Sequence, residues 1–300
     1  ALQHLDGRQR LAFEEFEEGA ATGRDVVDVV GDVELGDGRQ RVAAAGQREA
    51  VGVGDGRGQH LGAAGELVVL EDADRAVPDN GAGFLQQLQD AEALYILGDF
   101  FEVWIGDDFD NPFVSQVKQA LRALSDRGVK LFLMHGNRDF LLGDVFCTQT
   151  GATLLTDPTV IKLGDEPVLL MHGDSLCTQD TEYMKIRPLF RSAAWQQQIL
   201  SQSIEERIAF ARKVRGESQS GQQMKSAEIM DVTPAEVDAE MDKHGTALLI
   251  HGHTHRPFDH QWQHNGQARR RMVLGDWDDH SGWMIRWSND SGFKLEQFGF

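Results

Sequence analysis

The sequence predicts an α/β fold for the part of the chain that begins near Ala93. Continuous apolar runs alternate there with segments whose apolar residues recur every three or four positions, as strands and helices do when they pack in layers. All six Trp and both Tyr lie in this part, so it holds the large side chains of a core. Four of the apolar runs are followed directly by Gly, His, Asp or Asn, which predicts a functional site.

The region 1–82 has a different composition and is expected to have little order. It contains no Lys, Ile, Ser, Met, Cys, Trp or Tyr, yet it holds 14 of the 32 glycines. Only residues 67–70 (LVVL) form a short apolar run. Because Gly, Ala, Val, Asp and Arg are products of GC-rich codons, one hypothesis is translation of this region in a wrong frame. The alternative is a disordered, linker-like extension of a domain at 83–300.

Four apolar runs are predicted to be buried strands that deliver polar side chains at their carboxyl ends. The runs are residues 93–97 (ALYIL), 130–134 (KLFLM), 168–171 (VLLM) and 247–250 (ALLI). The motifs that follow them are GD, HGNRD, HGD and HGHTH. Strands that are apolar throughout are covered on both faces, and active sites lie in the crevice beyond their carboxyl ends. One such motif alone is common, but four in this order predict a shared site.

The side chains of these motifs predict a metal centre. Asp, Asn and several His without Cys form a ligand set that suits Mn²⁺, Fe²⁺ or Zn²⁺ better than Ca²⁺. A carboxylate such as Asp99 can bridge two ions about 4 Å apart, which together hold a phosphoryl group and lower the pKa of a shared water. The expected reaction class is therefore phosphoester hydrolysis.

The overall charge and composition argue against several other classes of protein. A net charge of −19 is unsuited to nonspecific binding of nucleic acid through a broad basic face. No run approaches the roughly 18 apolar residues of a membrane-spanning helix, and no signal-peptide pattern is present, so the protein is expected in the cytosol. Cys147 and Cys177 lie outside any CxxC spacing, which predicts two buried thiols.

Residues 181–226 are predicted to be a basic helical insertion. They hold eight Lys or Arg against four Glu, a net charge of +4. Apolar side chains recur four apart, as on helix faces: Trp195 with Ile199, and Ile204 with Ile208. These faces either pack on the core or form a cap that receives acyl chains while basic side chains contact anionic headgroups. The basic residues in question are Arg187, Arg191, Arg212 and Lys213.

Five segments carry a closer resemblance to a known family. They are LYILGDFFEVWIGDD (94–108), HGNRDFLLG (135–143), MHGDSLCTQD (171–180), IMDVTP (229–234) and HGHTHRP (251–257). Over about residues 83–300 the chain resembles the UDP-2,3-diacylglucosamine hydrolases, which are calcineurin-like metallophosphoesterases. Arg138 is diagnostic, since most of the superfamily has His after that Asn whereas this family has Arg, which can pair bidentately with a phosphate.

The resemblance implies a four-layer α/β/β/α metallophosphoesterase sandwich of two mixed sheets, with the helical cap at about 181–226. It implies hydrolysis of UDP-2,3-diacylglucosamine at the α-phosphate, which gives UMP and 2,3-diacylglucosamine 1-phosphate in lipid A biosynthesis. The implied cofactor is Mn²⁺, two ions per active site. A lipid-linked nucleotide sugar as substrate implies peripheral attachment to the cytosolic face of the inner membrane, with no nucleic acid or protein partner.

The resemblance also implies roles for individual residues. Asp99 would bridge both ions; Asn137, His172 and His251 would complete one metal site; and His253 would belong to the other. Arg138 would act with Asp99 in catalysis by stabilising negative charge on the α-phosphate. The implied substrate contacts are Asn137, Arg138, Asp180, Ser218, Gln222, Lys225 and His251.

Four further assignments follow from the same motifs. Gln222 stands where Asn is expected, which leaves its role open. Asp139 and His255 are expected to orient metal ligands, and residues 277–280 (WDDH) are expected to be structural.

One element of the family's pattern is absent. The family opens with a strand that ends in Asp-x-His, which supplies the other ligands of the site that uses His253. The sequence offers only LVVL followed by Glu71-Asp72-Ala73-Asp74, a faint imitation. If this strand is missing, its neighbour lacks a partner and the protein binds less metal. Two alternatives therefore stay open: a phosphoesterase for soluble nucleotides or phosphoproteins, and a metal-depleted phosphoesterase fold that serves as a binding scaffold.

Overall fold

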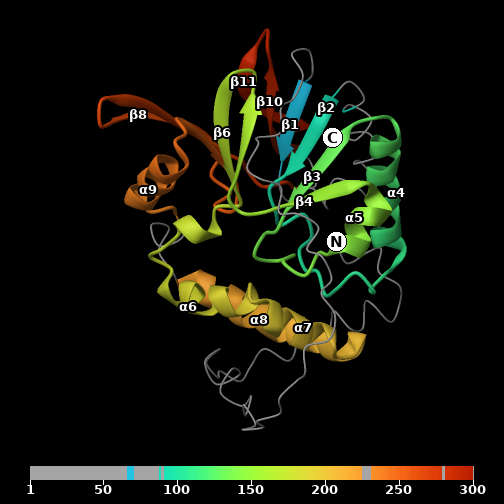
Figure 1. Cartoon of the computed structure of the whole chain (residues 1–300). Coiled ribbons are helices and arrows are strands. Elements are labelled where there is room, and N and C mark those ends of the chain that lie inside the picture. Colours follow the sequence, from blue (N-terminus) through green and yellow to red (C-terminus); the bar gives the residue numbers. More distant parts are fainter. Residues whose placement is uncertain (1–65, 71–87, 89–90, 225–230, 279–280, 300) are drawn as a thin grey trace, which may run out of the picture. The chain divides into compact units, whose positions relative to one another are not determined.

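The computed structural model describes residues 66–70, 88, 91–224, 231–278 and 281–299, with the side chains of 66, 67, 70 and 216–224 excepted. Residues 205–225 fall in a different compact unit from residues 58–204 and 226–300. Helix α8 (Ile204–Met224), which is nearly all of the described part of that unit, is therefore treated separately. The larger unit holds all the strands and the other described helices (Figure 1).

The first sheet has six strands in the order β11-β10-β1-β2-β3-β4. Its strands are β1 (Glu66–Leu70), β2 (Ala91–Ile96), β3 (Lys130–Met134), β4 (Ala152–Leu155), β10 (Ser281–Ser288) and β11 (Gly292–Gly299). Strands β1 to β4 run parallel, and β10 is antiparallel to both β1 and β11. The sheet is thus mixed, as expected.

The second sheet has five strands in the order β5-β6-β7-β9-β8. Its strands are β5 (Thr159–Leu163), β6 (Glu166–Met171), β7 (Leu248–His251), β8 (Phe258–His264) and β9 (Gln267–Val273). The central strands β6, β7 and β9 are parallel, and the two edge strands are antiparallel to their neighbours. This sheet is mixed as well.

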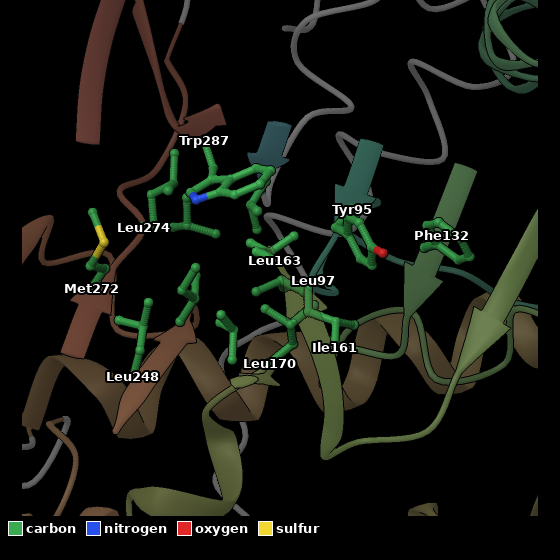
Figure 2. Close-up of a cluster of buried hydrophobic side chains, with 14 of the residues drawn as sticks. Tyr95, Leu97, Phe132, Ile161, Leu163, Leu170, Leu248, Met272, Leu274 and Trp287 are labelled. Carbon is green, nitrogen blue, oxygen red and sulfur yellow. The ribbon is translucent and has the colours of Figure 1, made fainter. Parts of the chain in front are cut away.

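Apolar side chains from both sheets form one core between them (Figure 2). The first sheet contributes Tyr95 and Phe132, whose rings stack 4.6 Å apart, and the second contributes Ile161, Leu170 and Leu248. Every second residue of a strand faces this core, so the intervening residues must be covered from outside.

Helices cover the outer faces. On the first sheet, α4 (Pro112–Asp126) and α5 (Asp144–Thr150) contact β3 and β4. On the second sheet, α9 (Pro234–His244) packs Val237 and Met241 against β6 and β7. The four-layer α/β/β/α sandwich expected from the sequence is confirmed.

The four strands predicted to carry functional motifs are all present. They are β2, β3, β6 and β7, and the last four residues of each are buried. Two of them lie side by side in the first sheet and two in the second, each pair parallel. Parallel neighbours end at the same edge of a sheet, so each sheet brings two motifs together.

The strand expected to be missing has its place filled by β1. Val68 and Val69 have no exposed surface, and Val69 belongs to the core between the sheets. The backbone of β1 pairs with β2 on one side and β10 on the other, so β2 does not lack a partner. This position requires buried apolar side chains and an extended backbone, which LVVL supplies despite the unusual composition around it. The expected domain boundary at residue 83 lies outside the described residues and stays a prediction.

The predicted insertion is helical where it is described. Helix α6 (Thr181–Phe190) begins at the N-cap Asp180, and α7 (Ala193–Leu200) begins at the N-cap Ser192. Phe190 and Trp195 pack on each other and on Phe140, which follows β3. The α6–α7 pair is therefore anchored on the loop that carries the HGNRD motif.

Cys147 and Cys177 are buried free thiols, as predicted, and burial raises their pKa to about 11 and about 12. Among the described helices, none has the combination of length and apolar character that a membrane-spanning helix needs.

We predict that Val69→Ala lowers the free energy of unfolding by about 2 kcal/mol, because it leaves a cavity in the core between the sheets. Val145→Ala is the matched control, since Val145 is 54% exposed and the same change there should be nearly neutral. Urea denaturation followed by circular dichroism measures both. Equal effects of the two changes would mean that β1 does not occupy the sheet.

Candidate metal centre

Tight backbone turns bring the ends of β2 and β3 together. Gly98 has φ +90°, a conformation that side chains disfavour, and it places Asp99 directly after β2. A Cβ on Gly136 would collide with the backbone nitrogen of Asp99. The two loops can therefore approach this closely only because both positions are glycine.

Asp139 holds these two loops in place. Its buried carboxylate accepts hydrogen bonds from the backbone N–H groups of Asp99 (3.3 Å), Phe100 (2.8 Å) and Gly136 (2.7 Å). Burial and the charge of Asp99 raise the pKa of Asp139. Asp139 therefore holds the backbones of both loops, and its expected role in orienting metal ligands stays a prediction.

Asp99, His172 and His253 form a cluster whose ligand atoms all lie within 4.8 Å of one another. Asn137 lies between them, with its Oδ1 3.1 Å from His172 Nε2 and 2.9 Å from His253 Nδ1. Asp99 Oδ1 is 3.8 Å from His172 Nε2. Side chains from both sheets therefore meet in one cluster, as the four strand motifs predict.

The hydrogen bond of His172 indicates which of its nitrogens can bind a metal. His172 Nδ1 lies 2.8 Å from the carbonyl oxygen of Leu97, and a carbonyl can only accept, so Nδ1 carries the proton. Nε2 is then the ring nitrogen that could bind a metal, and it faces Asn137 Oδ1 and Asp99 Oδ1. Three electron-rich atoms facing one another fit a bound cation.

His251 shows the same arrangement. Its Nδ1 donates to the carbonyl oxygen of Gly252 at 2.8 Å, and its Nε2 is buried without a hydrogen-bond partner among the described residues. Burial, together with the charge of Arg271, lowers the pKa of His251 to about 3. The ring is therefore neutral near pH 7 with one unused lone pair, although it lies outside the 4.8 Å cluster.

The other two titratable members of the cluster, His253 and Asp99, keep the form that a metal requires. The pKa of His253 is lowered to about 4; burial is the larger cause and the neighbouring His172 the second. Burial alone would raise the pKa of Asp99, but His172 and Arg138 outweigh it and hold that pKa below its ordinary value. Neutral imidazole and ionised carboxylate are the forms that bind divalent ions.

Arg138 lies at the edge of this centre. Its backbone N–H donates to Asp99 Oδ1 at 2.9 Å, and its guanidinium Nε lies 3.4 Å from Asp99 Oδ2. Nη1 also pairs with Glu102 Oε1 at 3.2 Å. The guanidinium is therefore held beside the ligands, with a fifth of the side chain exposed.

Comparison with known proteins decides the family. No protein-family model matches the chain. The UDP-2,3-diacylglucosamine hydrolase of Chromohalobacter salexigens is 51% identical over 227 residues, which are 74% of this chain and 92% of that protein. The protein of the same name from Pseudomonas putida KT2440 is 52% identical over 227 residues and is covered to 94%. This chain belongs to the UDP-2,3-diacylglucosamine hydrolase family.

Solved structures with a similar fold are distant. A novel archaeal phosphodiesterase has a TM-score of 0.42 at 8% identity, covering 78% of this chain and 99% of the other. Vacuolar protein sorting 29 from Cryptosporidium parvum has a TM-score of 0.36 at 11% identity, covering 79% and 98%. These likenesses are too weak to bear on function.

The substrate residues implied by the UDP-2,3-diacylglucosamine hydrolase family are described in part. Asp180 is buried and caps α6, since its carboxylate accepts from the backbone N–H of Tyr183 at 3.2 Å. The side chains of Ser218 and Gln222, and all of Lys225, lie outside the described residues, as do Asp72 and Asp74. Their implied roles stay predictions.

Two arginines of the insertion have a buried acidic partner. Arg187 and Arg191 both pair with the buried carboxylate of Asp174. The count of basic charge in the insertion left out this acidic partner, which the HGD motif supplies, and headgroup contact by the two arginines stays a prediction. The only sequence signal for Asp174 was its place in that motif.

Residues 277–280 (WDDH), which were expected to be structural, are described as far as Asp278. Trp277 has no exposed surface, donates through Nε1 to the carbonyl oxygen of Trp283 at 3.0 Å, and packs edge-on against Phe298. Asp279 and His280 lie outside the described residues.

We predict that Asp99→Ala abolishes activity and weakens Mn²⁺ binding at least about tenfold, because it removes the one carboxylate of the Asp99, His172 and His253 cluster. Asp126→Ala, which removes an exposed carboxylate on α4, is the control. Isothermal titration with Mn²⁺ measures the affinity. Normal turnover of Asp99→Ala would refute the assignment of the centre.

In the metal-free protein, acid should destabilise the fold through His251 and His253. Their folded-state pKa values lie below the ordinary value of about 6.5, so the unfolded chain binds more protons. This stability is fully present above about pH 6.5 and is lost as the pH falls toward 4 and 3, by at most about 1.4 kcal/mol per pH unit for each ring.

The matching experiment measures urea unfolding in EDTA at pH 7 and pH 4.5. His251→Asn should reduce the loss of stability between the two pH values, since Asn does not titrate. A loss as large as that of the unchanged protein would mean that His251 is not held neutral in the fold.

Proposed function

We propose that this protein hydrolyses UDP-2,3-diacylglucosamine at the α-phosphate, giving UMP and 2,3-diacylglucosamine 1-phosphate in lipid A biosynthesis. The observation that carries this proposal is 51–52% identity to curated hydrolases of that name over more than nine-tenths of their length. The convergence of Asp99, Asn137, His172 and His253 at the ends of strands from two sheets supports it.

The proposed centre holds two Mn²⁺ ions. Asp99 would bridge them, with Asn137, His172 and His251 on one ion and His253 on the other. When bound, such ions lower the pKa of a shared water and neutralise charge on phosphoryl oxygens. The lone pairs of His172 and His251 are available for this, because each ring already donates its other N–H to a carbonyl oxygen.

The remaining ligands would come from the residues that follow β1. Leu70 at the end of β1 lies opposite Ile96 of β2, so the chain leaves the sheet at the edge where Asp99 lies. Asp72 and Asp74 are the next carboxylates in sequence after Glu71. If neither binds, the protein holds one ion or none, and the metal-depleted binding scaffold becomes the better proposal.

Arg138 is proposed to stabilise the α-phosphate in the transition state. Its guanidinium is fixed beside Asp99 and Glu102 before substrate arrives, so little ordering is needed when a phosphate binds. A planar guanidinium gives two parallel hydrogen bonds to a phosphate, which an ammonium group does not.

The lipid part of the substrate is proposed to bind at the helical insertion. Asp180, Ser218, Gln222 and Lys225 are proposed substrate contacts, and the protein would attach peripherally to the cytosolic face of the inner membrane. The basic charge of the insertion and the lipid-linked substrate in the relatives' name support this proposal.

Hydrolysis in ¹⁸O-labelled water tests the proposed reaction. Attack at the α-phosphate places the label in UMP, whereas attack at the other phosphorus places it in 2,3-diacylglucosamine 1-phosphate. Mass spectrometry of the two products distinguishes these outcomes. Label in the lipid phosphate, or no cleavage of this substrate with Mn²⁺ present, would contradict the proposal.

Arg138→Lys should lower kcat roughly a hundredfold, the scale of a lost contact worth about 3 kcal/mol in the transition state. Mn²⁺ affinity should change little, because the guanidinium is not a ligand. Steady-state kinetics and isothermal titration give the two values. An equal loss of Mn²⁺ affinity would make Arg138 a structural part of the centre instead.

A further inference from the structure

Asp174 forms a buried junction between the metal centre and α6. It lies two residues after His172 and has no exposed surface. Its carboxylate accepts from Arg187 Nε at 2.8 Å, from Arg187 Nη2 at 3.1 Å, and from the hydroxyl of Tyr183. It also pairs with Arg191 Nη2 at 3.4 Å. All three partners come from α6 or its C-cap residue.

The same arginines reach two other parts of the centre. Arg187 Nη2 lies 3.6 Å from Asp157 Oδ2, and Asp157 Oδ1 accepts from the backbone N–H of His172 at 3.3 Å. Arg191 Nη2 donates to the carbonyl oxygen of His135 at 3.4 Å, two residues before Asn137. Helix α6 is thus connected to both loops that carry ligands from β3 and β6.

Tyr183 connects α6 to a third ligand. Its ring lies nearly parallel to the ring of His253, with 6.4 Å between the centroids. The hydroxyl of the same residue donates to Asp174. One side chain of α6 therefore contacts both His253 and Asp174.

The contacts of this buried junction are costly to break. Asp174 has no exposed surface, and its carboxylate is paired with Arg187 and Arg191. A buried charge that loses its partners is strongly unfavourable. Helix α6 can therefore leave this position only together with the loop that carries His172, or by leaving Asp174 unpaired.

We propose that Asp174 is a positioning residue that couples the placement of α6, at the base of the helical insertion, to the geometry of the metal ligands His172 and His253. This inference rests on the proposed metal centre. Because coupling between two sites is reciprocal, an ion that orders His172 and His253 also orders α6, and a fixed α6 favours ion binding.

Amide hydrogen exchange of the full chain, with and without saturating Mn²⁺, tests the coupling. In the unchanged protein Mn²⁺ should slow exchange in peptides from residues 181–190 by roughly fivefold or more, the lower end of typical coupling between sites. In Asp174→Asn, at an Mn²⁺ concentration that saturates the variant, this slowing should disappear. A merely structural defect would raise exchange in α6 but leave the effect of Mn²⁺ in place.

Two further variants complete the experiment. Lys185→Gln removes an exposed ion pair with Glu182 on the same helix and should keep the Mn²⁺ effect. Arg187→Lys keeps the charge but loses the bidentate contact with Asp174, so it should lose most of the Mn²⁺ effect. If circular dichroism shows that Asp174→Asn is unfolded, Arg187→Lys takes its place in the experiment.

Three results would overturn the inference. The coupling alone is overturned if Mn²⁺ binds the unchanged protein without slowing exchange in residues 181–190. It is also overturned if Mn²⁺ slows exchange fully in Asp174→Asn or in Arg187→Lys. Absence of Mn²⁺ binding to the unchanged protein, measured by isothermal titration, overturns the metal centre and the coupling with it.

Discussion

The site depends on lone pairs that face one another in a buried space. His172 Nε2, Asn137 Oδ1 and Asp99 Oδ1 face one another, and the hydrogen bond from His172 Nδ1 to Leu97 leaves Nε2 as the ring nitrogen that can bind a cation. A cation relieves their repulsion, so a metal ion is the natural occupant. Gly98 and Gly136 let the two loops approach, and the Asp139 carboxylate holds the backbones of the loops together. Both features stabilise this one arrangement.

Much of this arrangement could be predicted from the sequence. Buried parallel strands need continuous apolar residues, and a polar motif directly after such a strand lies at the sheet edge. That local rule was enough for β2, β3, β6 and β7. The division into two mixed sheets came instead from the resemblance to a known family, because apolar periodicity does not say which strands are neighbours.

Other parts could not be predicted, for definite physical reasons. Strand β1 is placed by backbone pairing and two buried valines, so its surroundings in sequence gave little sign of it. The pairing of Arg187 and Arg191 with Asp174 depends on how α6 is oriented in space, which charge counting along the chain does not contain. Asp180 shows a related limit. The resemblance to the family implies that Asp180 contacts the substrate, but it gave no sign that the carboxylate of Asp180 caps α6.

A crystal structure of the protein grown with Mn²⁺, with anomalous diffraction collected at the manganese edge, tests the central claim most directly. We expect two anomalous peaks about 4 Å apart on either side of the Asp99 carboxylate, one beside Asn137, His172 and His251 and the other beside His253. The second ion should also contact a carboxylate from the residues after β1. Absence of any peak at Asp99 would contradict the account of this chain as a metal-dependent hydrolase.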